Sequence, residues 1–229
     1  MHKCNIDYFK IIDTEEKAYW LGFLYADGCV TQNYKSLRIN LSPIDYHHLE
    51  KFNQCIQSDY NIKYKDNNRY ASLIISNKKF VENLVNKGCI PKKSLVLSFP
   101  NNNILPKNLR KDFIRGYFDG DGCFSAIMRN RKNKPNPVFE GEINVLGTYD
   151  ILKHIVLEFP TNIVPIKQFG KIYKIRYQSK QSIFSILSYL YNNSTIYLDR
   201  KFNKYIENMD NFIDKRKVKN NIPVTTTVI

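Results

Sequence analysis

The sequence predicts an α+β protein built from two similar halves, each with the element order αββαββα and related by a pseudo-two-fold axis. The first observation is an internal repeat, because AYWLGFLYADG (18–28) recurs as DFIRGYFDGDG (112–122). The second is that the same order of helical and alternating apolar patterns follows both copies. The 229-residue chain therefore reads as two halves of roughly 95 residues each.

In the first half, Asp13 or Thr14 caps the first helix, and Asp13 stands at capping-box spacing from Glu16. Strict alternation of apolar and polar residues from Leu37 to Ser42 predicts a strand with one polar face. Ser42 then serves as an N-cap before a proline that begins the next helix. The elements expected after the first helix are strands at 29–33 and 37–42, a helix at 43–57, a hairpin at 61–66 and 69–76, and a helix at 77–86.

The second half repeats this order with a longer first hairpin. The extra residues include the basic stretch RNRKNKPNP, 129–137. Thr148 is the expected cap of the central helix. The expected elements are a helix at 109–119, a strand from residue 123, a strand at 139–146, a helix to about 159, a strand at 172–178 and a helix at 181–191.

Each copy of the repeat carries a glycine in the middle of its helix. An offset of 94 residues (27 to 121) aligns Gly22 with Gly116 and Asp27 with Asp121. Glycine inside a helix costs roughly 0.5–1 kcal/mol relative to alanine, so it marks a close approach of another backbone. We therefore expect the two helices to pack against each other on their glycine faces.

Both copies end on Asp-Gly, an unusual helix end. Gly28 and Gly122 suit a left-handed helix stop. A carboxylate at this position meets the negative pole of the helix dipole. Packing on the glycine faces would also bring Asp27 and Asp121 together, and a hard divalent cation with oxygen ligands would stabilise that pair.

The charge of the chain indicates a polyanionic partner. The formal net charge is +14, from 35 Lys and Arg against 21 Asp and Glu. Nucleic acid and an anionic membrane surface both fit this charge. Nucleic acid is favoured, because the sequence contains neither an apolar run that could span a bilayer nor a secretory signal at its N-terminus.

The five cysteines are widely spaced and odd in number, which favours neither a disulfide framework nor a zinc site. We expect small buried hydrophobic residues in a reducing, intracellular compartment: the host cytoplasm or nucleoid, or an organelle matrix.

The polar faces of the predicted strands form a candidate DNA-binding surface. Arg and Lys can read guanine in the major groove, Asn and Gln can read adenine, and Glu can read cytosine. Lysine-rich loops would add contacts to phosphates. A half-exposed sheet carries polar residues on its wet face in any case, so each residue has this alternative interpretation. The candidates are Thr31, Asn33, Arg38, Asn40, Ser125, Arg129, Arg131, Glu142, Asn144, Lys174, Arg176 and Gln178.

The repeated segments resemble the paired motifs of the LAGLIDADG homing endonucleases. The sequence from 20 to 28 resembles the first motif and the sequence from 114 to 122 the second. Tyr25 stands where the family often has an acid, whereas the second copy keeps Asp119 there. The resemblance covers residues 14–209 and implies a monomer with two motif helices at the interface and two antiparallel sheets that form a DNA-binding saddle.

The resemblance also implies an activity and a set of site residues. The expected activity is hydrolysis of both strands of a long asymmetric DNA site by an intron-encoded or free-standing enzyme, leaving 3′ overhangs. Asp27 and Asp121 would hold Mg²⁺, for which Mn²⁺ can substitute, with the carbonyl groups of Ala26 and Gly120. The resemblance further assigns a basic role in catalysis to Lys93 and Lys201. A shift of one position in the alignment would move this role to the neighbouring Lys92 and Arg200.

The predicted domains are an N-terminal repeat at 1–100, a linker at 101–107, a C-terminal repeat at 108–210 and a basic tail at 211–229. Two rival hypotheses stay open at this point. The first is a maturase on the same fold that binds intron RNA. The second is a DNA-binding protein without catalysis, in which both acids and both lysines would be accidental.

Overall fold

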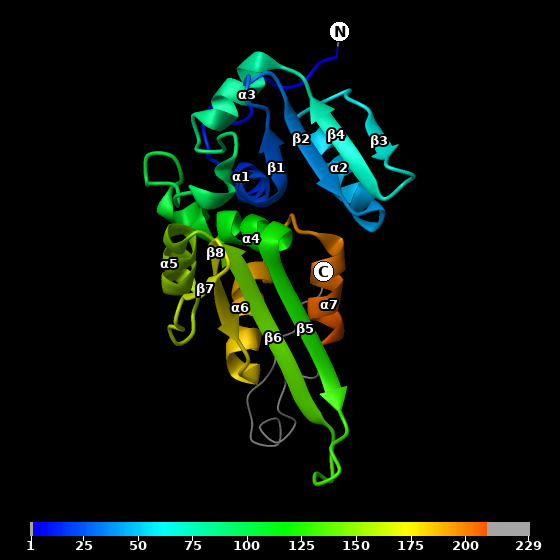
Figure 1. The fold of residues 1–229 in the computed structure, drawn as a ribbon, viewed down its shortest axis with the longest axis vertical. Helices are drawn as coiled ribbons and strands as arrows, with labels where there is room; N and C mark the ends of the chain where they lie inside the picture. Colours follow the sequence, from blue (N-terminus) through cyan, green and yellow to red (C-terminus); the bar gives the residue numbers. More distant parts are fainter. Residues whose placement is uncertain (1, 210–229) are drawn as a thin grey trace.

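The computed structural model describes residues 2–209, and the predicted basic tail lies outside them. Two four-stranded antiparallel sheets lie on either side of a central pair of helices, α1 and α4 (Figure 1). The elements of the first half are α1 (Glu15–Asp27), β1 (Gly28–Val30), β2 (Leu37–Leu41), α2 (Tyr46–Cys55), β3 (Ile62–Lys65), β4 (Tyr70–Ile75) and α3 (Lys78–Val85). The predicted fold class is confirmed.

The second half follows the same plan and adds one helix. Its elements are α4 (Arg110–Asp121), β5 (Gly122–Arg129), β6 (Val138–Gly147), α5 (Tyr149–Glu158), β7 (Lys167–Phe169), β8 (Ile172–Tyr177), α6 (Lys180–Tyr191) and α7 (Asp199–Glu207). The sheets have the equivalent orders β1-β2-β4-β3 and β5-β6-β8-β7. The helix α7 was not predicted, and its counterpart in the first half is only the short 3-10 turn η2 (Lys93–Leu95).

The motif helices pack through their glycines, as predicted. A Cβ atom on Gly22 would overlap the carbonyl oxygen of Phe113, and one on Gly116 would overlap the carbonyl oxygen of Tyr19. Only a residue without a side chain lets the two backbones approach this closely. The aromatic side chains around the contact are fully buried, so this helix pair is the centre of the core.

The helix ends differ in part from the predictions. Thr14, not Asp13, caps α1, because its side chain accepts a hydrogen bond from the amide of Lys17. The expected left-handed stop at Gly28 and Gly122 is wrong, since both residues are extended, with φ −73° and −82°. Their glycine identity has a steric reason instead. A Cβ on Gly28 would lie 2.6 Å from the carbonyl oxygen of Leu24, where α1 passes into β1.

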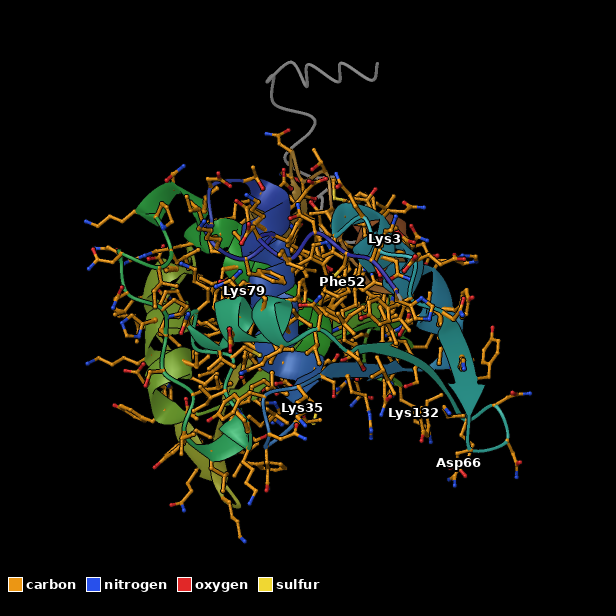
Figure 2. All side chains as sticks on the ribbon, turned by 90° about the horizontal axis from the view of Figure 1, so that it is seen from above. Lys3, Lys35, Phe52, Asp66, Lys79 and Lys132 are labelled. Carbon is orange, nitrogen blue, oxygen red and sulfur yellow. The ribbon has the colours of Figure 1, made fainter. Side chains whose placement is uncertain are left out.

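The first strand of each half begins directly at the end of its motif helix, and the hairpins that follow differ in length. β1 ends at Val30, three residues short of its predicted end, whereas β5 and β6 form a long hairpin that projects from the second half (Figure 1). Lys35 of the β1–β2 turn, Asp66 of the β3–β4 turn and Lys132 of the β5–β6 loop lie on the same side of the molecule (Figure 2). The hairpins of both halves therefore extend toward one face.

Helix α7 joins the second half to the first. Arg200 forms a two-pronged ion pair with Asp45, with nitrogen–oxygen distances of 3.1 and 3.0 Å. Lys51 of α2 lies 2.5 Å from the carboxylate of Asp199. No helix among residues 2–209 is long and apolar enough to cross a membrane.

Candidate functional site

The two motif aspartates end the two central helices. Asp27 is the last residue of α1 and Asp121 the last of α4. A Cβ on Gly120 would lie 3.3 Å from Oδ2 of Asp27, so the backbone of one motif runs beside the carboxylate of the other. The packing of the helix pair thus brings both acids to one place.

Both carboxylates are costly to ionise in this position. Burial and, to a smaller extent, the charge of Asp121 raise the pKa of Asp27 from its ordinary value of 3.8 to about 6, against the opposing effect of two lysines. Burial also raises the pKa of Asp121, although its side chain reaches solvent. Loss of water and a nearby like charge both favour the neutral acid. A bound cation would reverse this balance, because it stabilises the ionised form.

Lys93 and Lys201 lie beside the acids. Both side chains are buried, at 7% exposure each. The Nζ of Lys93 donates to the carbonyl oxygens of Ala26 (3.1 Å) and Gly28 (2.5 Å). The two alternatives lie elsewhere, since Lys92 is exposed and Arg200 pairs with Asp45. Of these four residues, Lys93 and Lys201 are therefore the ones whose ammonium groups are buried at the ends of the motif helices.

Lys201 is held by the end of α4. Its Nζ donates to the carbonyl oxygens of Phe118 (2.6 Å), Asp119 (2.8 Å) and Gly122 (2.5 Å). Burial lowers the pKa of Lys201 to about 8. An ammonium group at a helix C-terminus is favourable, because carbonyl groups without partners collect there. Each lysine thus offsets the unfavourable carboxylate at the end of a motif helix.

The donor atoms at the site suit a hard divalent cation. Two carboxylates and the carbonyl groups of Ala26 and Gly120 would supply oxygen ligands only, which Mg²⁺ prefers. The raised pKa values of Asp27 and Asp121 fit a site whose charge is incomplete without a cation. No cluster of three or more His, Cys, Asp or Glu side chains that could hold a metal occurs in the described part of the chain.

Tyr25 and Asp119 stand two residues before the motif aspartates, and their hydrogen-bond partners were not predicted. Asp119 is buried and accepts hydrogen bonds from the hydroxyls of Tyr19 (2.8 Å) and Tyr191 (2.7 Å). Its third donor is the backbone amide of Leu198 (2.8 Å). Tyr25 donates to the carbonyl oxygen of Lys87 at 2.5 Å. The one signal in the sequence was the mismatch between Tyr and Asp at this motif position.

In the first sheet, the structure separates the four predicted DNA contacts into two groups. Arg38 and Asn40 are exposed on β2 and share a face, as predicted. Thr31 and Asn33 are not on a strand, because β1 has ended, and they hydrogen-bond to each other in the turn at 2.8 Å. The predicted strand positions of Thr31 and Asn33 are therefore wrong, because a hairpin turn begins directly after Val30.

The same face of the first sheet carries further residues that were not predicted as DNA contacts. Asn40 is paired in register with Ser72, and Ser72 with Lys63 of the outer strand β3. Ile74 stands opposite Arg38. The sequence of β4 (Tyr70–Ile75) does not mark which of its residues lie on the polar face, because it contains few polar positions.

In the second sheet, most of the predicted contacts lie in neighbouring rows of one face. Ser125 is paired with Glu142, and Asn144 with Arg176. The remaining residues differ in their backbone: Arg129 and Lys174 are on strands, whereas Arg131 follows β5 and Gln178 follows β8. The expected strand position of Arg131 is therefore wrong, because β5 ends at Arg129.

Ion pairs cross this second face. Glu142 binds the side chains of Arg176 and Asn144. Glu140, which was not among the predicted residues, pairs with Arg129 and Arg131. These exposed pairs are weak and easily exchanged for contacts with a polyanion. The glutamates hold the arginine side chains on the face of the sheet.

Each sheet has a hollow at the equivalent place, over β3 and β4 in the first sheet and over β7 and β8 in the second. The hollow on the first sheet has a volume of about 290 Å³ and is lined by Lys63, Lys65 and Ser72, among others. The hollow on the second sheet has a volume of about 370 Å³ and is lined by Lys174 and Arg176, among others. The two halves thus carry hollows at equivalent places that are lined by different side chains.

All five cysteines lie in the described residues and are free of disulfides, in line with the prediction. The expectation that they are buried holds only for Cys89, because Cys29 and Cys123 are exposed and the other two are half-buried. Cys29 and Cys123 follow the motif aspartates by two residues, on the exposed faces of β1 and β5.

No protein-family model and no curated protein sequence matches the chain. Solved structures do resemble it. The LAGLIDADG meganuclease I-AabMI bound to uncleaved DNA superposes with a TM-score of 0.60 at 13% identity, over 88% of this chain and 91% of that one. I-CpaMI bound to uncleaved DNA gives a TM-score of 0.60 at 13% identity, over 91% and 94% of the two chains.

A third structure extends over nearly the whole chain. The I-LtrWI LAGLIDADG homing endonuclease bound to target DNA gives a TM-score of 0.57 at 12% identity, over 97% of this chain and 100% of that one. The strand orders, the paired glycine helices and these superpositions agree on one architecture. The chain has the two-domain saddle fold of the LAGLIDADG homing endonucleases.

Proposed function

We propose that this protein is a site-specific homing endonuclease that cuts both strands of double-stranded DNA. The observation that carries the proposal is the pairing of Asp27 and Asp121 at the ends of two packed helices, each flanked by a buried lysine. A purely structural site has no reason to bring two like charges together. A phosphodiester hydrolase has one, because divalent ions between carboxylates can activate water and stabilise the leaving oxygen.

The residues that would hold Mg²⁺ are Asp27, Asp121 and the carbonyl groups of Ala26 and Gly120. When bound, the ion neutralises charge on the phosphate and lowers the pKa of a water ligand. Mn²⁺ offers the same oxygen chemistry and is expected to substitute. The carboxylates would hold the ion between the two halves, and Lys93 and Lys201 would add positive charge where negative charge develops in the transition state.

The polar faces of the two sheets are proposed to grip the DNA. A net charge of +14 supports strong attraction to the phosphate backbone. The I-AabMI, I-CpaMI and I-LtrWI structures are of proteins bound to DNA. Because the first hairpins differ in length and the sheets differ in side chains, we propose a long, asymmetric target that is cut by a monomer to leave 3′ overhangs. Such an enzyme would promote homing of an intron or another mobile element.

The proposal is tested by incubating the protein with a library of double-stranded DNA sites and Mg²⁺ and sequencing the cut ends. We expect one family of related, non-palindromic sites cut on both strands with 3′ overhangs, and no cutting when the metal is chelated. The matched control is the Asp27→Asn, Asp121→Asn double variant. Full cleavage by this variant would refute the assignment of the acids. Failure to cut any DNA, together with tight binding to intron RNA, would favour a maturase.

DNA affinity should fall steeply with salt. Neutralising six or more phosphates releases enough counterions to weaken binding by about 10³-fold or more between 50 and 200 mM salt. The measurement is a series of fluorescence anisotropy titrations with a labelled duplex in the presence of Ca²⁺ rather than Mg²⁺. A curve that does not change with salt would contradict DNA binding through the basic faces of the sheets.

A further inference from the structure

We propose that Tyr25 and Asp119, which occupy the same position in the two repeats, are positioning residues that each fix the buried lysine of their own half beside the acids. The inference rests on the proposed nuclease function for its consequences, but its geometry stands on the protein alone. The two residues differ completely in chemistry, and neither touches the reacting atoms in this proposal. They act through the backbone segments that carry Lys93 and Lys201.

In the second half, Asp119 holds the beginning of α7. Its buried carboxylate accepts a hydrogen bond from the amide of Leu198, the residue immediately before α7. A carboxylate at a helix N-terminus is favoured by both the free amides and the helix dipole. Lys201 lies in the first turn of that helix and returns its Nζ to the carbonyl oxygen of Asp119 itself. The same residue therefore anchors both the backbone and the ammonium group.

Two tyrosines complete the anchor. Tyr191 of α6 and Tyr19 of α1 donate their hydroxyls to the carboxylate of Asp119. His48 lies 3.1 Å from the hydroxyl of Tyr19, so the network also reaches α2. Four helices thus meet at one carboxylate. A buried carboxylate whose two oxygens are both paired holds the elements around it in one arrangement.

In the first half, Tyr25 holds the segment before Lys93. Its hydroxyl donates to the carbonyl oxygen of Lys87, directly after α3. Gly88 makes room for this contact, because its φ is +98° and a Cβ there would overlap the hydroxyl of Tyr25. The neighbouring thiol of Cys89 donates to the carbonyl oxygen of Leu24. The chain is therefore tied to α1 shortly before it reaches Lys93.

The two devices have the same result by opposite chemistry. One half uses a hydroxyl donor that meets a backbone carbonyl, and the other uses a carboxylate acceptor that meets a backbone amide. In each half the bond joins the motif helix to the segment with the buried lysine. The two sites are consequently not equivalent, and loss of either bond should loosen one lysine and spare the other.

Lysine acetylation tests the positioning roles of Tyr25 and Asp119 without DNA or metal. The protein is treated with a low concentration of acetic anhydride, and modification of each lysine is followed by peptide mass spectrometry. For Asp119→Asn we expect acetylation of Lys201 to be about tenfold faster with Lys93 unchanged, because the lost charged hydrogen bonds protect only α7. For Tyr25→Phe we expect the reverse pattern. Equal acceleration at both lysines, or none at either, would overturn the proposal.

Two further variants provide a milder substitution and a control. Tyr191→Phe removes one donor to Asp119 and should accelerate Lys201 acetylation in the same direction by a smaller factor, which covers the case in which Asp119→Asn fails to fold. Tyr60→Phe is the matched control. It also removes a hydroxyl that donates to a backbone carbonyl oxygen, that of Ser76 at 2.8 Å, and neither Tyr60 nor Ser76 lies on α1, α4 or α7. Its acetylation pattern should equal that of the unaltered protein.

Strand-specific cleavage gives the functional readout. With each strand of the target labelled separately, Tyr25→Phe should slow the cutting of one strand about tenfold and Asp119→Asn that of the other, so both variants accumulate nicked DNA. A slowing that affects both strands equally in both variants would contradict the inference. If the unaltered protein cuts no DNA, the proposed function fails while the acetylation result still decides the positioning roles.

Discussion

Replacing either Asp27 or Asp121 by asparagine should abolish double-strand cleavage and leave DNA binding in place. The change removes one negative charge where a divalent ion would bind, and it preserves the size of the side chain. Charge stabilisation of several kcal/mol is lost from the transition state, so the cleavage rate should fall by about 10³-fold or more. Binding should persist, because the sheet faces that are proposed to contact the DNA are untouched.

The measurement is a single-turnover cleavage assay next to an anisotropy titration with the same duplex. Arg38→Ala is the useful contrast, since Arg38 lies on the exposed face of β2 and is a proposed DNA contact. It should weaken binding and leave the rate of the bound complex nearly unchanged. An Asp27→Asn variant that cuts at the normal rate would remove the acids from the mechanism.

The same substitution should stabilise the metal-free protein above pH 6. The folded-state pKa of Asp27, about 6, lies above its ordinary value of 3.8, so the folded state holds a proton that the unfolded chain has lost. Stability from this group is fully present below pH 3.8 and is lost as the pH rises through 6. The penalty is on the order of 2 kcal/mol, because one pKa unit is worth ~1.4 kcal/mol and the carboxylate keeps some contact with water.

Asp27→Asn should therefore raise the free energy of unfolding at pH 7.5 and make no difference near pH 3.5. Urea unfolding at the two pH values, with a chelator present, measures both. Addition of Mg²⁺ should stabilise the unaltered protein more than the variant, since the ion relieves a repulsion that the variant lacks. A variant that is less stable than the unaltered protein at pH 7.5 would contradict the raised pKa.

Gly22→Ala and Gly116→Ala should each destabilise the protein by about 3 kcal/mol or more. Local helix propensity predicts the opposite sign, because alanine is favoured over glycine by ~1 kcal/mol in a helix. The added methyl group would overlap the carbonyl oxygen of Phe113 or of Tyr19. Overpacking costs typically 1–3 kcal/mol where side chains can shift, and these neighbours are backbone atoms of a packed helix.

Thermal and urea unfolding measure this effect, and Gly170→Ala is the control. Gly170 has φ +60° with nothing within 4 Å of an added Cβ, so only the backbone strain of a left-handed residue applies, about 1 kcal/mol. A Gly22→Ala variant as stable as the unaltered protein would mean that the helices can separate at no cost. In the double variant, the losses should not add, because both substitutions push the same pair of helices apart.

Much of the local structure could be predicted because it depends on local rules. The alternation from Leu37 to Leu41 gives the observed pattern of buried and exposed residues, and Thr148 caps α5 as expected. The turn that removes Thr31 from β1 could not be predicted, since the pattern of apolar residues does not mark where pairing ends. The helix α7 was missed for a similar reason, because its two buried residues, Lys201 and Tyr205, include a charged one.

By itself, the sequence determined that the protein has two related halves, that two glycine-bearing helices meet between them, and that each helix ends in a carboxylate. These features follow from an internal repeat, from the cost of glycine inside a helix and from the unfavourable position of a carboxylate at a helix C-terminus. The last two effects act within a single helix. The basic composition likewise pointed to a polyanionic partner without reference to any fold.

Only the tertiary structure decided what surrounds the acids. The amide of Leu198 reaches Asp119 across 79 residues of sequence, and the hydroxyl of Tyr25 reaches Lys87 across 62. The burial of Lys93 and Lys201 against the ends of the motif helices is equally non-local. Such contacts depend on how whole helices pack, because packing fixes which distant donors and acceptors lose water together and must pair with each other.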